Sequence, residues 1–425
     1  MPFASLVVAL NIKLMNMLRY IHDACITMDY VFSRRYYEED NQYYNPRKPI
    51  LFLEVNPLVP LGSSAVYEMI DAARQIGASM VLLEQRYMGR SLPTREFSVA
   101  TLKELFTVPQ SVQDVVHFCR KMKEKVPGIK IILFGCSNGG MIAALARKYY
   151  SEFVDGAIVS SAALRIQLEY EKYAEVLGGD FSNPALGGSD KCLAVLRDAH
   201  TAFGEKLGSP EGRRLLERIF GLCDGDLEGW QLETAFTLYG DSTGEDLEYN
   251  DPQCEGDYCN IQKICSKLAN EKKPPLDMLA DIYKANSSPG SCLAVQLQQY
   301  VSILKDIMNS GTDRMNDFHV CTTRGLFGTC SHVTCPFFTG HDRDWFDYLT
   351  WLCEVGFGLS IEEILEGIEG FKAYVGDFRT TKNILSINGD ADPWYPSSIF
   401  KEGEGPEVEM VNGASHCYWC SADNE

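Results

Sequence analysis

The chain has 425 residues, which is long for one small core and suits a large α/β domain that carries an insertion. Its 39 Lys and Arg against 58 Asp and Glu give a formal net charge of −19, which opposes binding to nucleic acid or to anionic lipid. The fractions of 45% hydrophobic and 23% charged residues exclude general disorder and indicate a globular protein with a sizeable core.

The first apolar stretch, residues 3–10, is too short to span a bilayer, which needs about 20 residues. It lacks a basic flank and a clear small-residue cleavage site, which leaves three interpretations: a poor signal peptide, a truncated start, or a helix. No later uninterrupted apolar run reaches spanning length. We therefore expect no stable membrane insertion.

Between residues 49 and 161, short apolar runs alternate with segments of helical periodicity, which is typical of βαβ units and a mostly parallel sheet. The second of the expected helices begins with a possible capping box, Ser111 to Asp114. The elements expected here are strands at 50–53, 79–83, 130–134 and 156–160, and helices at 65–76, from 111 to about 125, and 141–150.

From about residue 164 to 338 the alternation ceases, and amphipathic helices are separated by loops rich in Gly, Pro and Asp. Nine of the 15 cysteines lie between Cys192 and Cys335, which predicts a disulfide-stapled segment in an oxidising compartment. We therefore divide the chain into an α/β core and a helical, cysteine-rich cap. The core takes residues 1–164 and 339–425, the cap takes 165–338, and helices are expected at 167–177, 191–207, 213–222 and 292–308.

The α/β pattern returns after residue 338. A helix is expected from a capping box, Ser360 to Glu363, to about Tyr374. Two further strands are expected at 383–387 and 408–411. These elements complete the core.

The motif Gly135-x-Ser137-x-Gly139 lies between an apolar strand and a helix of small residues, the context of the nucleophile elbow in α/β-hydrolases. Glycines suit this turn because it strains the nucleophile's backbone and brings neighbouring chains close. The helix start also points N–H groups at a developing oxyanion, and the amide of Asn138 is the first such donor. A second match at residues 240–244 runs into acidic residues 245–248 and is interpreted as a loop.

A serine nucleophile needs a general base, and the base needs a carboxylate that orients it. In α/β-hydrolases these residues follow one another in the order Ser, Asp, His. His416 is the single histidine after the last expected strands. The loop after the strand at 383–387 offers Asp390 and Asp392, and the spacing alone leaves both open.

Three stretches carry a more specific pattern. Glu84 to Pro93 reads E-Q-R-Y-M-G-R-S-L-P, Gly135 to Gly140 reads G-C-S-N-G-G, and Asn388 to Trp394 reads N-G-D-A-D-P-W. They are similar to E-H-R-Y-Y-G-x-S-x-P, G-G-S-Y-G-G and N-G-x-x-D-P-W of the prolyl carboxypeptidase family, which also includes dipeptidyl peptidase II and the thymus-specific serine protease. Shorter matches occur at residues 34–37, 157–162 and 345–356, and the resemblance spans residues 34 to 416.

The resemblance implies a serine exopeptidase without a cofactor, built as an α/β-hydrolase core with a helical cap. It implies Ser137 as nucleophile, His416 as general base, and Asp392, the aspartate before Pro-Trp, as the orienting residue. Members cleave peptides next to proline, either as Pro-Xaa carboxypeptidases, our first choice, or as dipeptidyl peptidases. A lysosomal, vacuolar or secreted location is implied, and a homodimer follows from family analogy alone.

Two departures from the family pattern keep other functions open. Residues 53–57, Leu-Glu-Val-Asn-Pro, replace a Gly-Gly-Glu loop, so the second oxyanion donor is unassigned. The histidine segment matches only one of the family's two histidines, and the sequence stops nine residues after His416. The rivals are a lipase or esterase, and a catalytically silent hydrolase-fold binding protein.

Four more residues are candidates for substrate binding: Glu84, Arg86, Tyr87 and Trp394. The alternative for Glu84 and Arg86 is an ion pair that fixes the loop in which both lie. The alternative for the two aromatic residues is packing at the ends of strands.

The cysteines allow one competing interpretation. Cys417-x-x-Cys420 beside His416, and a second cluster at residues 330–335, contain residue types that bind zinc or undergo redox chemistry. Neither cluster has a matching second pair, so disulfides are favoured and no metal is expected. Cys136, next to the nucleophile, is the candidate for an unpaired thiol.

Overall fold

The structure is a computed structural model. It describes residues 49–55, 73–232, 234, 247–270, 272–287, 292–331, 335–340 and 345–418, and the backbone alone of residues 18–21, 34–39, 245–246 and 344. The apolar stretch at 3–10, the second G-x-S-x-G match at 240–244, Asn56, Pro57 and Cys420 lie outside the described residues.

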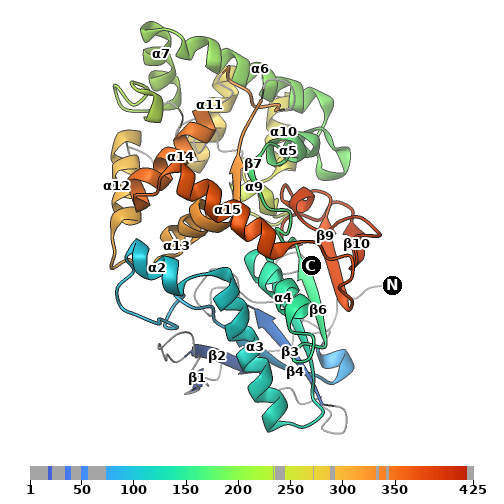
Figure 1. Cartoon of the computed structure of the whole chain (residues 1–425). Coiled ribbons are helices and arrows are strands. Elements are labelled where there is room, and N and C mark those ends of the chain that lie inside the picture. The colour runs from blue at the N-terminus through green and yellow to red at the C-terminus, as the bar shows by residue number, and fades with distance from the viewer. Residues whose placement is uncertain are drawn as a thin grey trace.

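An eight-stranded sheet forms the base of the molecule (Figure 1), in the order β1-β2-β4-β3-β5-β6-β9-β10. The β1-β2 and β2-β4 pairs are antiparallel, and all the other pairs are parallel. The strands are β1 (Leu18–Ile21), β2 (Arg34–Glu39), β3 (Ile50–Val55), β4 (Ser79–Leu83), β5 (Lys130–Cys136), β6 (Gly156–Ser160), β9 (Ile384–Gly389) and β10 (Glu407–Val411). The predicted α/β class with a mostly parallel sheet is confirmed.

Both faces of this sheet are covered, as parallel strands require. On β3, Leu51 and Leu53 belong to one large apolar cluster that includes α3 (Val108–Lys125) and α4 (Ser137–Tyr149). Phe52 points to the other face, where it packs in a smaller cluster with Met80. The alternation along β3 therefore places an apolar layer on each side of the sheet.

Helix α3 begins before the expected Ser111. Thr107 caps it: the Thr107 hydroxyl accepts from the Gln110 amide at 3.3 Å, and the Gln110 side chain accepts from the Thr107 amide at 3.2 Å. Ser111 is buried inside the helix, and Asp114 pairs with Arg86 instead of capping. Thr-x-x-Gln completes the reciprocal box, whereas Ser-x-x-Asp does not form it here.

The remaining helices fall into two groups (Figure 1). Two separate apolar clusters are built mainly from one group, which lies beyond the sheet: α5 (Lys172–Ser182), α6 (Asp190–Leu207), α7 (Pro210–Phe220), α9 (Glu245–Tyr249), α10 (Ile261–Asn270) and α11 (Pro275–Asn286). The other group contributes to the cluster that covers the sheet: α2 (Val99–Leu105), α12 (Leu293–Lys305), α13 (Thr312–His319), α14 (Asp344–Phe357) and α15 (Ile361–Val375). Short helical turns occur at Pro184–Leu186, Val320–Arg324 and Tyr395–Ser397.

The helix expected at 167–177 is wrong in its first part. Gln167–Tyr170 form strand β7, which pairs in parallel with β8 (Gly325–Gly328), and α5 begins only at Lys172. Along β7 only Tyr170 is fully buried, and its hydroxyl donates to the Pro393 carbonyl at 3.0 Å. The pairing depends on a partner strand far along the chain, which local periodicity does not reveal.

Six disulfides occur among the described cysteines. Eight of the nine cysteines between residues 192 and 335 pair with one another, and Cys321 pairs with Cys353 on α14, so the stapled segment is confirmed. Cys119 on α3 is a free, buried thiol. The pairs are Cys136–Cys417, Cys192–Cys265, Cys223–Cys292, Cys254–Cys259, Cys321–Cys353 and Cys330–Cys335.

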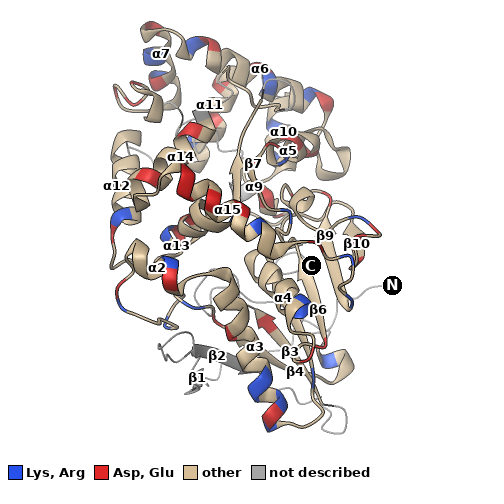
Figure 2. Ribbon diagram, viewed as in Figure 1, with Lys and Arg blue, Asp and Glu red and all other residues tan. Residues whose placement is uncertain are grey.

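Acidic and basic residues are spread over helices of both groups, with acidic turns prominent on α14 and α15 (Figure 2). Within the described part of the chain, no helix combines the length and apolarity that a membrane span requires.

Candidate active site

Ser137 lies at the sharp junction between β5 and α4. It is half-buried, and its φ of +53° is in the left-handed region, which costs free energy for a residue with a side chain. A Cβ on Gly135 would lie 2.4 Å from backbone atoms of Gly139, and one on Gly140 would lie 2.7 Å from the Gly135 carbonyl oxygen. The close approach of β5 to α4 therefore explains the glycines on both sides of Ser137.

His416 and Asp392 form a buried pair. The Nδ1 atom of His416 lies 3.0 Å from Oδ1 of Asp392, which also accepts from the Trp394 amide at 2.8 Å. Asp390 is exposed and accepts from the Gly413 amide instead, at 2.6 Å. A carboxylate on Nδ1 fixes the tautomer whose Nε2 is free to accept a proton.

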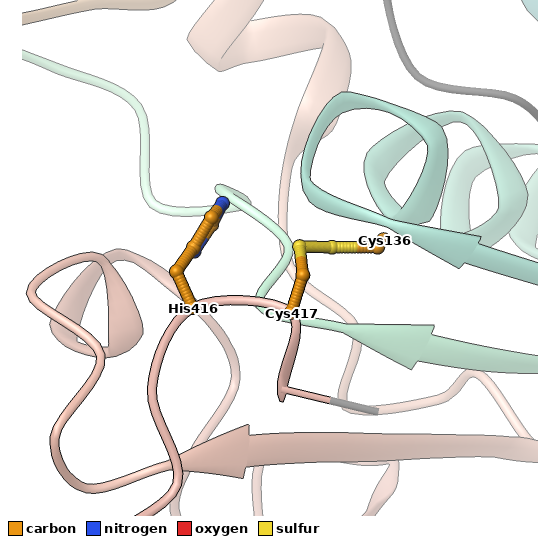
Figure 3. A group of neighbouring side chains, drawn as sticks. All are labelled: Cys136, His416 and Cys417. Carbon is orange, nitrogen blue, oxygen red and sulfur yellow. A yellow bond between two sulfur atoms is a disulfide. The ribbon is translucent and has the colours of Figure 1, made fainter. Parts of the chain in front are cut away.

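The loops that carry Ser137 and His416 are joined covalently (Figure 3). Cys136, which precedes Ser137, forms a disulfide with Cys417, which follows His416, and their Cα atoms are 5.8 Å apart. The Cys417 amide also donates to the Ser161 hydroxyl at 3.1 Å. The prediction that Cys136 is unpaired is therefore wrong, because a partner 281 residues away folds beside it.

The same disulfide bears on the zinc alternative. Ligand atoms of Cys136, His416 and Cys417 lie within 4.8 Å of one another, the spacing of a metal site. Both sulfur atoms are bonded to each other, however, so neither is a thiolate that could bind zinc. Cys330 and Cys335 are likewise bonded to each other.

Glu248 on α9 is a neighbour of the site that the sequence did not reveal. Its carbonyl accepts from the His416 amide at 2.8 Å, and its Oε2 accepts from the indole N–H of Trp394 at 2.7 Å. Burial lowers the pKa of His416, but the carboxylates of Asp392 and Glu248 together outweigh it and raise the pKa to about 9. The acidic stretch interpreted as a loop thus contains a short helix that contacts the site.

Trp394 belongs to an aromatic group beside the pair. Its ring stacks on Tyr170 with 5.4 Å between centroids, and Tyr173 meets it edge-on at 4.9 Å. Trp394 is half-buried, whereas Tyr170 is fully buried. Three aromatic rings from β7, α5 and the loop after β9 therefore pack together next to Asp392.

The other three substrate-binding candidates lie in the interior. Both guanidinium nitrogens that face Asp114 donate to it, from Arg86 Nε at 2.6 Å and Nη2 at 2.7 Å. Glu84 accepts from the Ser91 hydroxyl at 2.7 Å, and Tyr87 packs edge-on against Phe106. These contacts favour a structural role for all three residues. The expected ion pair between Glu84 and Arg86 is not the one observed, because Arg86 pairs with Asp114.

Two buried carboxyl groups near the carboxyl edge of the sheet were also missed. Burial raises the pKa of Glu54, on β3, to about 8. Burial and then the charges of Asp390 and Asp392 raise the pKa of Asp180, on α5, to about 8. Nothing in the local sequence distinguishes either residue from an exposed acid.

Asn138, the expected oxyanion donor, is the second residue of α4 and is buried. Its side-chain oxygen accepts from Nε2 of Gln85 at 3.0 Å, which ties the start of α4 to the loop after β4. The backbone amide of Asn138 lies in the first turn of α4, where amides have no partner within the helix. The loop expected to give the second donor lies partly outside the described residues.

Comparison with known proteins places the chain in a family. Residues 26–423 match the model of the family described as serine carboxypeptidase S28. The chain is 27% identical to a putative serine protease of Caenorhabditis elegans, with 91% of this chain and 79% of the relative covered. It is 26% identical to the thymus-specific serine protease of Mus musculus, covering 91% and 78%, and 24% identical to the mouse lysosomal Pro-X carboxypeptidase, covering 91% and 79%. The chain belongs to the serine carboxypeptidase S28 family and is a serine-type peptidase.

Proposed function

We propose that the protein is an exopeptidase that cleaves peptides next to proline, with Ser137, His416 and Asp392 as its triad. The observation that carries this proposal is the 3.0 Å contact of His416 with Asp392, in a loop bonded to the residue before a strained Ser137. Strain at a serine between strand and helix is typical of a nucleophile elbow.

In the proposed reaction, Ser137 Oγ attacks the scissile carbonyl while His416 Nε2 takes its proton. Asp392 stabilises the imidazolium, and the Asn138 amide donates to the oxyanion. Collapse of the tetrahedral intermediate breaks the peptide bond, and His416 returns the proton to the leaving amine. Water, deprotonated by His416, then hydrolyses the acyl-enzyme and restores Ser137.

The aromatic group supports a preference for proline. A proline ring is apolar and rigid, and it packs well against flat aromatic faces such as that of half-buried Trp394. The names of the mammalian relatives support the same choice, since one is a Pro-X carboxypeptidase. Our first choice remains the Pro-Xaa carboxypeptidase.

The dipeptidyl peptidase alternative is favoured by a different observation. Glu248, from a helix beyond the sheet, carries a negative charge close enough to His416 to raise the pKa of that imidazole. Carboxylates attract the N-terminal ammonium of a peptide and repel its C-terminal carboxylate. We propose that residues 165–338 form the cap that brings Glu248 to the site.

We also propose that the protein works in a lysosomal or secreted setting. The name of one relative, a lysosomal Pro-X carboxypeptidase, supports this location.

Labelling with a fluorophosphonate tests the nucleophile. Ser137→Ala should abolish labelling, while Ser161→Ala, a neighbouring serine, should keep it; labelling of Ser137→Ala would exclude the triad. Cleavage of an N-blocked peptide ending in Pro-Phe, compared with a free-amine Lys-Pro amide, then separates the two specificities. A folded protein that cleaves neither and takes no label would be the silent binding protein.

A further inference from the structure

We propose that the Cys136–Cys417 disulfide is a positioning device for the triad, and that its reduction switches the peptidase off. This inference rests on the proposed function. Its starting point is a juxtaposition: one bridge joins the residue before the nucleophile to the residue after the general base. The other described bridges join helices and loops elsewhere, and their cysteines are separated by 5 to 73 positions in the sequence.

The loop after β10 has several attachments, and they run in different directions. The Ala391 amide donates to the Ala414 carbonyl at 3.1 Å, and the His416 amide donates to Glu248 on α9. These bonds hold the loop to the Asp392 side and to α9. The disulfide adds a direct covalent link to the turn of Ser137, and the distance from Ser137 to the imidazole depends on that link.

Two residues at the bridge, Ser137 beside Cys136 and Cys417 itself, have an unfavourable backbone conformation. Ser137 has a φ of +53° and Cys417 a φ of +51°, and neither is a glycine. Residues with side chains occupy the left-handed region only when the surrounding structure holds them there. The turn between β5 and α4 holds Ser137 whether or not the bridge is present, but without the bridge Cys417 is free to rotate to a commoner φ, which turns the adjacent imidazole of His416.

The bridge is also accessible from one side. Cys136 is 7% exposed, whereas Cys417 is half-buried at the surface of its loop. A dithiol reductant would attack the Cys417 sulfur as a thiolate, form a mixed disulfide, and release Cys136 as a thiolate that takes a proton. The second thiol of the reductant then displaces Cys417. Two electrons and two protons pass to the protein, and the reductant leaves as a cyclic disulfide.

A double variant, Cys136→Ala with Cys417→Ala, tests the role of the bridge. We expect kcat to fall about 100-fold, as for a small misplacement of catalytic groups, with KM changed by less than about 3-fold. Cys254→Ala with Cys259→Ala is the matched control, because that bridge joins two half-buried cysteines far from Ser137 in sequence. The control should keep the wild-type kcat, and circular dichroism should show that both variants are folded.

The outcomes separate the two proposals. If the oxidised wild type neither turns over proline peptides nor takes a fluorophosphonate, the proposed function fails, and the role of the bridge with it. If the wild type is active and the folded double variant has a kcat within about 3-fold of it, only the positioning role is overturned.

Reduction of the wild-type protein covers the case in which the double variant does not fold. Aliquots taken during treatment with dithiothreitol are assayed, then quenched with iodoacetamide and mapped by mass spectrometry. EDTA is present throughout, because the reduced pair and His416 offer three ligand atoms to trace zinc. Loss of kcat should follow alkylation of Cys136 and Cys417 and reverse with oxidised glutathione. Full activity after most of this pair is reduced would overturn the proposal.

Discussion

The disulfides beyond the sheet and the one at the candidate active site join different kinds of structural element. Cys192–Cys265, in the helical clusters, is buried and joins α6 to α10, two helices that already pack together. Cys136–Cys417 instead joins a strand-to-helix turn to a loop, 281 residues apart in sequence, at the edge where the chemistry is proposed. A bridge between packed helices mainly restricts the unfolded chain. On our proposal, a bridge between the loops that carry Ser137 and His416 also restricts the native geometry.

The largest effect should come from the orienting carboxylate. Asp392→Asn should lower kcat about 10,000-fold, because an amide favours the wrong tautomer of His416. Asp390→Asn is the control, since Asp390 is exposed and accepts from the Gly413 amide rather than from the imidazole. Steady-state kinetics of the two variants check this. Equal losses of kcat in both variants would show that Asp392 is not the carboxylate that orients His416.

The helical clusters should respond in stability and not in chemistry. Removing Cys192–Cys265 by a double alanine substitution should cost about 4 kcal/mol of unfolding free energy, from the entropy of a loop of 73 residues. Removing Cys254–Cys259, which closes a loop of 5, should cost about 2 kcal/mol. Urea unfolding of the oxidised proteins gives both values. A large loss of kcat in either variant, at temperatures where it is folded, would show that these bridges affect catalysis as Cys136–Cys417 is proposed to do.

The buried Glu54 in the sheet should make stability depend on pH. Its pKa is raised from 4.5 to about 8, so the folded protein holds a proton there that the unfolded chain loses above pH 4.5. The free energy of unfolding should therefore fall by about 2 kcal/mol as the pH rises from about 5 to about 7. Glu54→Gln should remove that part of the slope. Thermal unfolding across this pH range checks it, and a variant with the wild-type slope would contradict the prediction.

The smallest effect concerns the helix that reaches the site from outside the sheet. Glu248→Gln keeps an oxygen acceptor for the Trp394 indole but removes a negative charge that raises the pKa of His416. Because His416 must be neutral to act as a base, kcat/KM should rise with pH as the imidazole loses its proton. The midpoint of that rise should move down by less than about one pH unit in the variant. An unchanged or upward-shifted midpoint would show that Glu248 does not act on the base.

Local signals in the sequence predicted part of this architecture well. The strand at 79–83 and the capping box at Ser360 match the structure, because each depends on residues only a few positions apart in the sequence. The family resemblance led to Asp392, which is the aspartate found against His416. The signal for each of these features therefore lies in the same short stretch of sequence as the feature itself.

The misplaced start of α3 is a local error, but the other errors have a different cause. β7 pairs with β8, and Cys136 bonds Cys417, so in each case the partner lies far along the chain. The contact of Glu248 with His416 depends on where α9 packs. The residues beside Glu248 in the sequence form an acidic stretch that does not indicate this contact. Tertiary contacts such as these override local preference and carry no local pattern.

The position of β9 in the sheet has a consequence for biosynthesis. β9 lies directly beside β6, in register from Ala157 with Ile384, although the whole of residues 161–383 is translated between the two strands. A ribosome that has completed the Ser137 turn has therefore made none of the segment that supplies Asp392 and His416. If the proposed triad holds, a nascent or prematurely terminated chain exposes Ser137 without its general base, and proteolytic activity arises only when the last strands join the sheet.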